Sequence, residues 1–291
     1  MFLRVVKGSF ARKRQRKLIA VAAIALGASV TTAMLAVALG VGDKVNRELR
    51  SYGANIEALP RQRPLTLTAT GVRLESTGAK GHIRQNDLAR IKSVFWAHNI
   101  LSFTPFLYTD GTVSTNGSDQ VRAVVVGTWF DHALAMEGGT SLRTGVRVVS
   151  PWWKVTGNWP RDGECLVGAS LAERLHASPQ DSVSLTCSGR TLTLRISGLL
   201  ATGAAEDEQL ITGLEFVQRI AGLEGKIDRL EVSALTNPED DLSRKDPQTL
   251  SGEEYERWTC TPYPSSIARD LETVLEGAEA RPILRISQTE G

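Results

Sequence analysis

The chain has 291 residues, of which 42% are hydrophobic, 6% aromatic and 23% charged, and its formal net charge is +2. This length and apolar content suit one large domain or two smaller ones with real cores, which excludes a disulfide miniprotein and a low-complexity disordered protein. A mean hydropathy of −0.13 excludes several membrane spans in this chain but leaves room for one.

The positive charge is concentrated at the N-terminus. Residues 1–17 carry seven cations and no acid, so the other 274 residues sum to −5 once +7 is taken from +2. Such asymmetry indicates a membrane or nucleic-acid surface at one end of the chain. Residues 18–41 hold no charge, and this favours a membrane over a nucleic acid as the surface next to the basic N-terminus. As a helix they would be about 36 Å long, enough to cross a bilayer core of about 30 Å.

The span gives the chain an orientation. A basic N-terminus stays in the cytoplasm, so we predict a cytoplasmic amphipathic segment over 1–17, a transmembrane helix of the bacterial inner membrane over 18–41, and an extracytoplasmic (periplasmic) main domain. The hydroxyls within the span can bond to carbonyls of the same helix. The alternative is a cleaved signal peptide processed at 36–38, although the apolar region of a signal peptide usually has only about 7 to 15 residues.

The helix is expected to continue beyond the membrane. Val45 and Leu49 follow Val41 at helical spacing, and a glycine often ends a helix. This pattern predicts a stalk over 42–52 that stops at Gly53.

After the stalk, strand and helix patterns alternate. The expected elements are a strand over 54–59 closed by Pro60, a loop or irregular edge over 61–81, a helix from about Asn86, strands over 100–108 and 121–126, and turns at Asp110-Gly111 and Asn116-Gly117 between these strands. Leu88, Ile91 and Phe95 mark the apolar face of the helix.

The middle of the chain is mostly β in pattern, and its end returns to a strand, a helix and a strand. The expected elements are strands over 164–167, 182–186 and 191–200, a short helix over 170–176, a strand over 227–234, a helix capped by Ser265 or Ser266 with Ile267, Leu271, Val274 and Leu275 on its apolar face, and a strand over 282–286. Similar units at both ends predict one α/β subdomain split by a β-rich insert, in an α+β fold.

Residues for catalysis are hard to find. The chain contains no GxSxG motif, and residues 222–226 (GLEGK) fail as a phosphate loop because the glycines are too close and Ile227 occupies the Ser/Thr position. The four histidines stand singly, and the acidic runs 206–208 and 239–241 are typical of solvated turns. We therefore predict no catalytic, cofactor-binding or metal-binding residues and no enzyme activity.

The three cysteines matter because an extracytoplasmic domain lies in an oxidising compartment. Cys165 and Cys187 fall in predicted strands of the insert, where neighbouring strands could bring them to disulfide distance, so they are the disulfide candidate. Cys260 is then left over. It lies in a structural or partner-binding segment that contains Trp258, Cys260, Pro262 and Tyr263.

Two aromatic segments have alternative interpretations. The segment around Cys260 is expected to be a packed loop that anchors the last helix, with a reactive thiol or a metal site as the alternative. Trp152, Trp153 and Trp159 are expected to form a hydrophobic cluster with Val155, with a ligand shelf as the alternative.

Several motifs resemble the MacB/FtsX-like ABC transporter permeases of type VII. In 51–60 (SYGANIEALP) a Gly-Ala-Asn segment and an apolar strand follow the stalk, as they do in that family. The further matches are VVGT at 125–128, LVGASLA at 166–172 and ISGLL at 196–200, so the likeness extends over nearly the whole chain. The segments closest to a subgroup associated with iron-uptake gene clusters are 152–155, 206–208 and 258–263.

The resemblance implies a MacB-like periplasmic core domain made of two parts. A porter-like α/β subdomain covers 53–128 and 214–287, and a β-rich, sabre-like insert covers 129–213. Such permeases work as dimers with a separate cytoplasmic ABC ATPase that binds the ATP, so this chain is expected to hold no cofactor of its own. Their other partner is a periplasmic or outer protein, and nucleic acid is not among their partners. Motion passes through the stalk to the outer domain.

Members of that family carry three more spans after this domain, whereas here 288–291 would begin the second stalk. We therefore expect a fragment, a truncated reading frame or one half of a split permease. The expected function is that of a permease subunit that transmits ATP-driven conformational change (mechanotransmission) to a domain binding partner proteins or substrate, with iron or another metal as the transported class that the subgroup implies. The alternative is a single-pass periplasmic sensor or adaptor without transport activity.

Overall fold

The computed structural model describes residues 19, 21–32, 34, 53–61, 65–69, 72–76, 81–115, 120–135 and 141–283. The chain divides into two compact units, residues 1–51 and 52–291. Residues 21–32 are helical, and the hydroxyls of Thr31 and Thr32 donate to carbonyls one turn earlier, as predicted. Within the described part of the chain, no helix is both long and apolar enough to cross a membrane. The predicted segments 1–17, 42–52 and 288–291 lie outside the described residues.

The second unit consists mainly of strands. They are β1 (Ile56–Pro60), β2 (Leu65–Ala69), β3 (Val72–Ser76), β4 (Ile83–Arg84), β5 (Ile100–Thr115), β6 (Val121–Thr128), β7 (His132–Ala135), β8 (Ser141–Thr144), β9 (Lys154–Gly157), β10 (Glu164–Gly168), β11 (Ser182–Cys187), β12 (Arg190–Ala201), β13 (Gln209–Gly213), β14 (Lys226–Ile227), β15 (Arg229–Ala234) and β16 (Ala278–Pro282). The helices are α3 (Val146–Val149), α4 (Ala169–Leu175), α5 (Leu214–Ala221), α6 (Gly252–Thr259), α7 (Pro264–Glu272) and the 3₁₀ helices η1 (Gln85–Ser93), η2 (Ala205–Glu208) and η3 (Pro247–Thr249).

Four strands from the two ends of this unit form an antiparallel sheet in the order β16-β1-β15-β5. With η1 between β1 and β5, and α7 between β15 and β16, the chain order of this part is β-helix-β-β-helix-β, the ferredoxin-like arrangement. Its apolar face, with Phe103 and Val232, packs with Leu88 and Leu271 in the main core. This sheet therefore joins strands from the two ends of the unit, 56–115 and 229–282.

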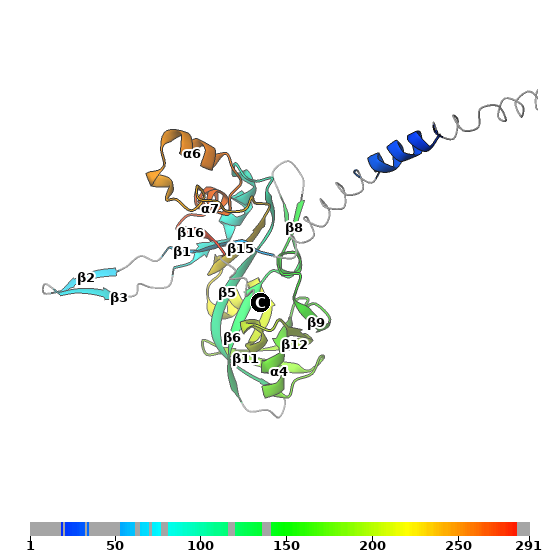
Figure 1. Ribbon diagram of the computed structural model, residues 1–291. Helices are drawn as coiled ribbons and strands as arrows, with labels where there is room; N and C mark the ends of the chain where they lie inside the picture. The colour runs from blue at the N-terminus through cyan, green and yellow to red at the C-terminus, as the bar shows by residue number, and fades with distance from the viewer. Residues whose placement is uncertain are drawn as a thin grey trace, which may run out of the picture. The chain divides into compact units, whose positions relative to one another are not determined.

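The long strand β5 links the strands β16, β1 and β15 to a second group of strands within one ten-stranded sheet (Figure 1). Its residues 100–106 pair with β15, whereas 112–115 pair with β11, and β6 pairs along its other edge. Pairings that start from β5 run through β6, β13, β10, β12 and β11 and return to β5. Six strands thus close into a small barrel, whose apolar residues, among them Val125, Leu185 and Ile196, join the main core.

The barrel changes two expectations. The predicted turn at Asp110-Gly111 is wrong, because β5 continues through both residues. Gly111 serves a close approach instead, since a Cβ there would lie 2.8 Å from Leu185 Cδ1 and 3.0 Å from Val125 Cγ2. The expected boundary at 128/129 separates β6 from the insert. However, β6 pairs directly with β13 of the insert, so the barrel contains strands from both predicted subdomains.

Four local predictions also differ from the structure. Residues expected as a loop or irregular edge contain the hairpin of β2 and β3. The helix at 85–93 is 3₁₀, and its three-residue repeat places Leu88, Ile91 and Val94 inward while Phe95 is 70% exposed. Helix α7 begins at Pro264 after Tyr263, without a serine cap. The last strand is Ala278–Pro282, and the predicted residues beyond 283 lie outside the described part.

Candidate functional site

The chain enters and leaves the second unit at the same place. We call Gly53–Ile56 the incoming segment and Pro282–Ile283 the outgoing segment. Ile56 of β1 is in register with Pro282 of β16, and the Ile283 amide donates to the Asn55 carbonyl at 2.9 Å. The Asn55 side chain bonds to the Ala234 carbonyl at 2.9 Å and accepts from the Ala234 amide at 3.0 Å. Asn55 therefore fastens both segments to the end of β15.

A tryptophan lies directly on the incoming segment. Gly53 has φ +62°, and a Cβ at this position would overlap the ring of Trp152 and the carbonyl of Val149. Only glycine fits both the backbone conformation and the space. The next residue, Trp153, is buried with Leu200 and other residues on a second face of the barrel strands, with Val155 and Trp159 packed against them. The expected cluster therefore holds Trp153, Trp159 and Val155, whereas Trp152 lies outside it and is 36% exposed.

A buried carboxylate lies where β5 passes from one group of strands to the other. Asp228 is 5% exposed. Its Oδ2 accepts from the Tyr108 amide at 3.0 Å, and its Oδ1 lies 2.8 Å from His82 Nδ1. Asp228 thus bonds to the backbone of β5 between the stretches that pair with β15 and β11. The signal in the sequence was the charged pair Asp228 and Arg229, which stands between the apolar residues Ile227 and Leu230.

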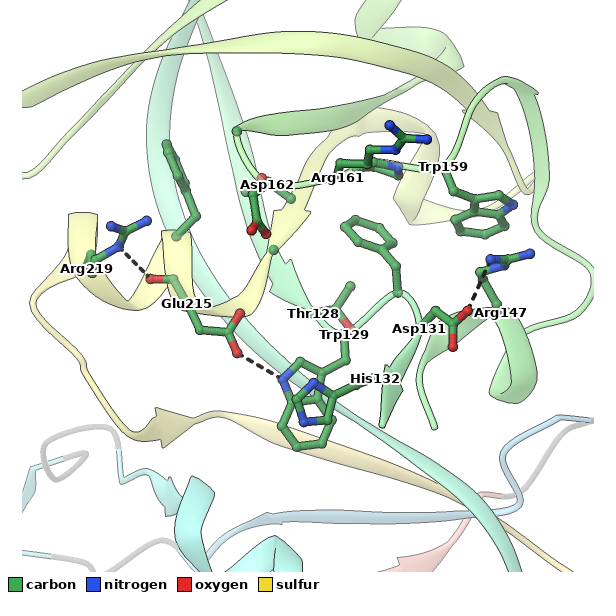
Figure 2. Close-up of a pocket in the computed structure, with 16 residues that line it drawn as sticks. Thr128, Trp129, Asp131, His132, Arg147, Trp159, Arg161, Asp162, Glu215 and Arg219 are labelled. Carbon is green, nitrogen blue, oxygen red and sulfur yellow. Dashed lines mark hydrogen bonds and ion pairs between the residues drawn. The ribbon is translucent and has the colours of Figure 1, made fainter. Parts of the chain in front are cut away.

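The hollow in Figure 2 has a volume of about 360 Å³ and lies where β6 and β13 end and α5 begins. Trp129 stacks on His132 with ring centroids 4.1 Å apart, and the Glu215 carboxylate accepts from the Trp129 indole at 3.4 Å. On the other side, Arg147 lies over the Trp159 ring at 5.6 Å and reaches Asp131 at 3.3 Å (Figure 2). The lining therefore combines aromatic rings with charges of both signs.

Two polar groups of this hollow are already engaged within the protein. Its Thr128 hydroxyl is buried and donates to the Pro105 carbonyl at 2.8 Å, so it is not free as a nucleophile. Asp131 is held by Arg143 as well as Arg147, and the hydrogen bond from Arg143 keeps the pKa of that carboxyl below its ordinary value. No group of three or more His, Cys, Asp or Glu side chains that could hold a metal occurs among the described residues.

The structure separates the two cysteines expected to form a disulfide. Cys165 and Cys187 are both buried free thiols. Strand β12 lies between their strands, and they are in register with Ile196 and Arg190 of β12, six residues apart. Six residues of strand span roughly 20 Å, whereas a disulfide needs Cα atoms within about 7 Å. In this fold the expected bond cannot form, and burial raises the pKa of the Cys165 thiol to about 12.

The predicted segment around Cys260 is the end of helix α6, which includes Trp258, followed by a short loop that leads to α7. Trp258 and Tyr263 are buried against Leu242, and the Tyr263 hydroxyl donates to Asp240 Oδ2 at 2.6 Å. The Pro262 carbonyl accepts from the Asn237 amide at 2.9 Å, while Cys260 is exposed. These contacts fit the anchoring interpretation, with helix α7 starting directly after the cluster.

The two acidic runs also have structural partners. Asp240 in the run 239–241 holds the Tyr263 hydroxyl, and this hydrogen bond lowers the pKa of its carboxyl. Asp207 in the run 206–208 accepts from the amides of Thr202 and Gly203 at 2.7 and 3.0 Å. Burial acts in the opposite direction, but these bonds lower the pKa of Asp207. Each of these carboxylates closes a turn.

The chain matches the family described as MacB-like periplasmic core domain over residues 18–243. The chain belongs to this family. The match confirms the predicted resemblance to the MacB/FtsX-like ABC transporter permeases, and it includes the predicted span, the barrel and three of the four strands of the sheet, since β16 lies beyond residue 243. No curated protein is similar enough to the chain to match.

Solved structures similar to this MacB-like domain include two from transporters. The periplasmic region of MacB from Actinobacillus actinomycetemcomitans is 12% identical at a TM-score of 0.47, over 79% of this chain and 89% of that one. The extracellular domain of the noncanonic ABC-type transporter YknZ from Gram-positive bacteria is 12% identical at a TM-score of 0.45, over 79% of this chain and 100% of that one.

Proposed function

We propose that this chain is a non-enzymatic permease subunit of an ABC transporter, anchored in the bacterial inner membrane by residues 18–41. Its extracytoplasmic domain takes up motion that a separate cytoplasmic ATPase generates. The observation that carries the proposal is the adjacency of the incoming and outgoing segments, joined by the bond from the Ile283 amide to the Asn55 carbonyl. A domain mounted on two neighbouring stalks needs this arrangement, because a relative shift of the stalks then acts directly on β1 and β16.

The partners follow from the family. We infer a dimer of permease copies, the ATPase that binds ATP, and a periplasmic partner protein that docks on the outer domain. Iron or another metal as the transported class rests on the subgroup resemblance alone. The second candidate function is a single-pass sensor or adaptor, and the hollow of Figure 2 favours it, because its rings and charges could recognise a ligand without transport.

Membrane anchoring is tested on the full chain expressed in a Gram-negative host. The wild-type chain is expected to remain in carbonate-washed membranes, and protease added to spheroplasts should digest the domain after Gly53. The double substitution Ile24→Arg and Leu26→Arg places two charges inside the span and should abolish this retention. Asn46→Arg, outside the span, is the matched control. Retention of the double variant would refute the anchor.

The proteins that copurify with the chain then distinguish a transport function from a sensing function. An affinity-tagged chain purified in mild detergent, after expression with the neighbouring genes, should retain an ABC ATPase and a second permease copy. Recovery of the anchored chain without an ATPase would leave the sensor or adaptor as the function.

A further inference from the structure

A second cavity lies at the junction of the sheet, the barrel and the segment between α3 and β9. Its volume is about 350 Å³. Phe106 and Tyr108 of β5, together with Trp152 and Trp153, supply four aromatic side chains to its lining. The rings of Phe106 and Tyr108 are stacked with centroids 6.2 Å apart. Cavities of this size that are lined by rings and lie between subdomains are typical sites for small molecules.

The polar lining narrows the chemistry of the ligand. Arg229 bonds through Nη2 to Glu57 at 3.1 Å and to Glu231 at 2.9 Å. Its Nε–H is buried without a hydrogen-bond partner, one of two such side-chain atoms in the described part of the chain. A buried donor without a partner favours a ligand that brings an acceptor. Glu206 and Glu231 also line the cavity, and their charge disfavours an anionic acceptor, so an uncharged carbonyl oxygen fits best.

Tyr108 completes this polar side. Burial raises the pKa of its hydroxyl to about 12, although nearby Arg229 acts against the shift. The phenol therefore stays neutral throughout the physiological range and adds no charge to the cavity.

The cavity lies close to both the incoming and the outgoing segment. Trp152 lies on Gly53 of the incoming segment, and Ile283 of the outgoing segment is itself part of the lining. Trp153 continues from Trp152 into the cluster on the barrel strands. A ligand in this cavity would therefore contact Ile283 of the outgoing segment and the barrel directly, and would reach the incoming segment through Trp152.

We propose that this cavity binds a small aromatic molecule with an uncharged carbonyl acceptor, and that binding tightens the incoming and outgoing segments. The proposed binding rests only on the cavity and its lining residues. The effect of tightening on the membrane helices rests on the proposed function.

The binding test uses benzamide as the probe and the purified full chain in detergent, with saturation-transfer NMR. Benzamide is expected to bind at millimolar concentration, whereas benzoate, with the same ring and a negative charge, should bind at least about 5-fold more weakly. Trp152→Ala should weaken benzamide binding at least about 5-fold, because it removes one ring wall. Phe95→Ala, which removes an exposed ring outside the cavity lining, is the matched control and should change nothing.

The second variant tests the acceptor. Arg229→Lys keeps a cation beside Glu57 and Glu231 but removes the Nε–H, so it should weaken benzamide while leaving toluene, which has no acceptor, unchanged. No benzamide binding, equal binding of benzoate, or unchanged binding in Trp152→Ala overturns the assignment of the cavity.

The communication step has its own readout. Hydrogen exchange of the Asn55 and Ile283 amides, which donate to Val232 and Asn55, should slow when benzamide binds. Binding with unchanged exchange at both amides overturns the tightening. Both results are obtained without the ATPase, so their failure is distinct from failure of membrane anchoring or ATPase capture.

Discussion

Replacing Gly53 by alanine tests the contact between the incoming segment and Trp152. The residue has φ +62°, where an L side chain is strained by about 1–2 kcal/mol. The added methyl group would also overlap the Trp152 ring and the Val149 carbonyl, and overpacking of this kind costs about 1–3 kcal/mol. The two effects together predict a loss of about 2–5 kcal/mol in the free energy of unfolding.

The assay is chemical denaturation of the purified full chain, followed by circular dichroism. Gly225→Ala is the matched control, because Gly225 has φ +69° but nothing within 4 Å of the point where a Cβ would lie. Gly225→Ala should therefore lower the free energy of unfolding only through backbone strain, by about 1–2 kcal/mol. The difference between the two variants then measures the packing part alone.

A double-mutant cycle assigns the packing part to the tryptophan. In a Trp152→Ala background the ring overlap is gone while the Val149 carbonyl remains, so Gly53→Ala should cost about 1–2 kcal/mol less than in the wild type. If Gly53→Ala costs no more than Gly225→Ala, or costs the same in both backgrounds, the contact between Gly53 and Trp152 does not constrain the domain and the reasoning is refuted.

Three further predictions concern the barrel and the cysteines. Asp228→Ala leaves a buried β5 amide without its acceptor and should lower the free energy of unfolding by about 1–3 kcal/mol in the same assay, while Asp228→Asn, which keeps an acceptor oxygen, should lose less. A maleimide should label Cys260 in the native chain but Cys165 only after unfolding, and a peptide crosslink between the two buried cysteines in mass mapping would contradict the barrel register. Gly168→Ala inserts a methyl group against the backbone of η2 and should destabilise by about 1–3 kcal/mol, whereas Gly213→Ala, with nothing within 4 Å, should be close to neutral.

Local patterns were enough for four elements of the insert, but not for β7, β8, α3, β9, η2 and β13. The expected strands at 164–167, 182–186 and 191–200 and the helix at 170–176 agree with β10, β11, β12 and α4 to within two residues. These segments bury one face against the barrel core, so their apolar alternation follows the structural period directly. The same logic failed at Phe95, because a 3₁₀ helix repeats every three residues and places Val94 inward instead.

Two glycines show why this residue type is hard to interpret from the sequence, because it serves several purposes. Gly111 was read as a turn, yet it lies within β5 and makes room for Leu185 of β11. Gly53 was read as a helix stop, and its closest contact is Trp152, almost a hundred residues later in the chain. Neither use can be recognised locally, since the atom that requires the glycine comes from a distant segment.

The sequence by itself determined the family and the basic N-terminus followed by an apolar run, and it predicted the strands β10, β11 and β12 and the helix α4. Composition, periodicity and short motifs are properties of the sequence itself, so they can be recognised without knowing which residues are neighbours in the fold. Only the tertiary structure decided that β5 joins a ferredoxin-like sheet to a closed barrel, that Cys165 and Cys187 lie far apart, and that the incoming and outgoing segments meet beside Trp152. These features depend on pairing between segments distant in the chain, where strand register and ring closure, rather than local preference, fix which side chains meet.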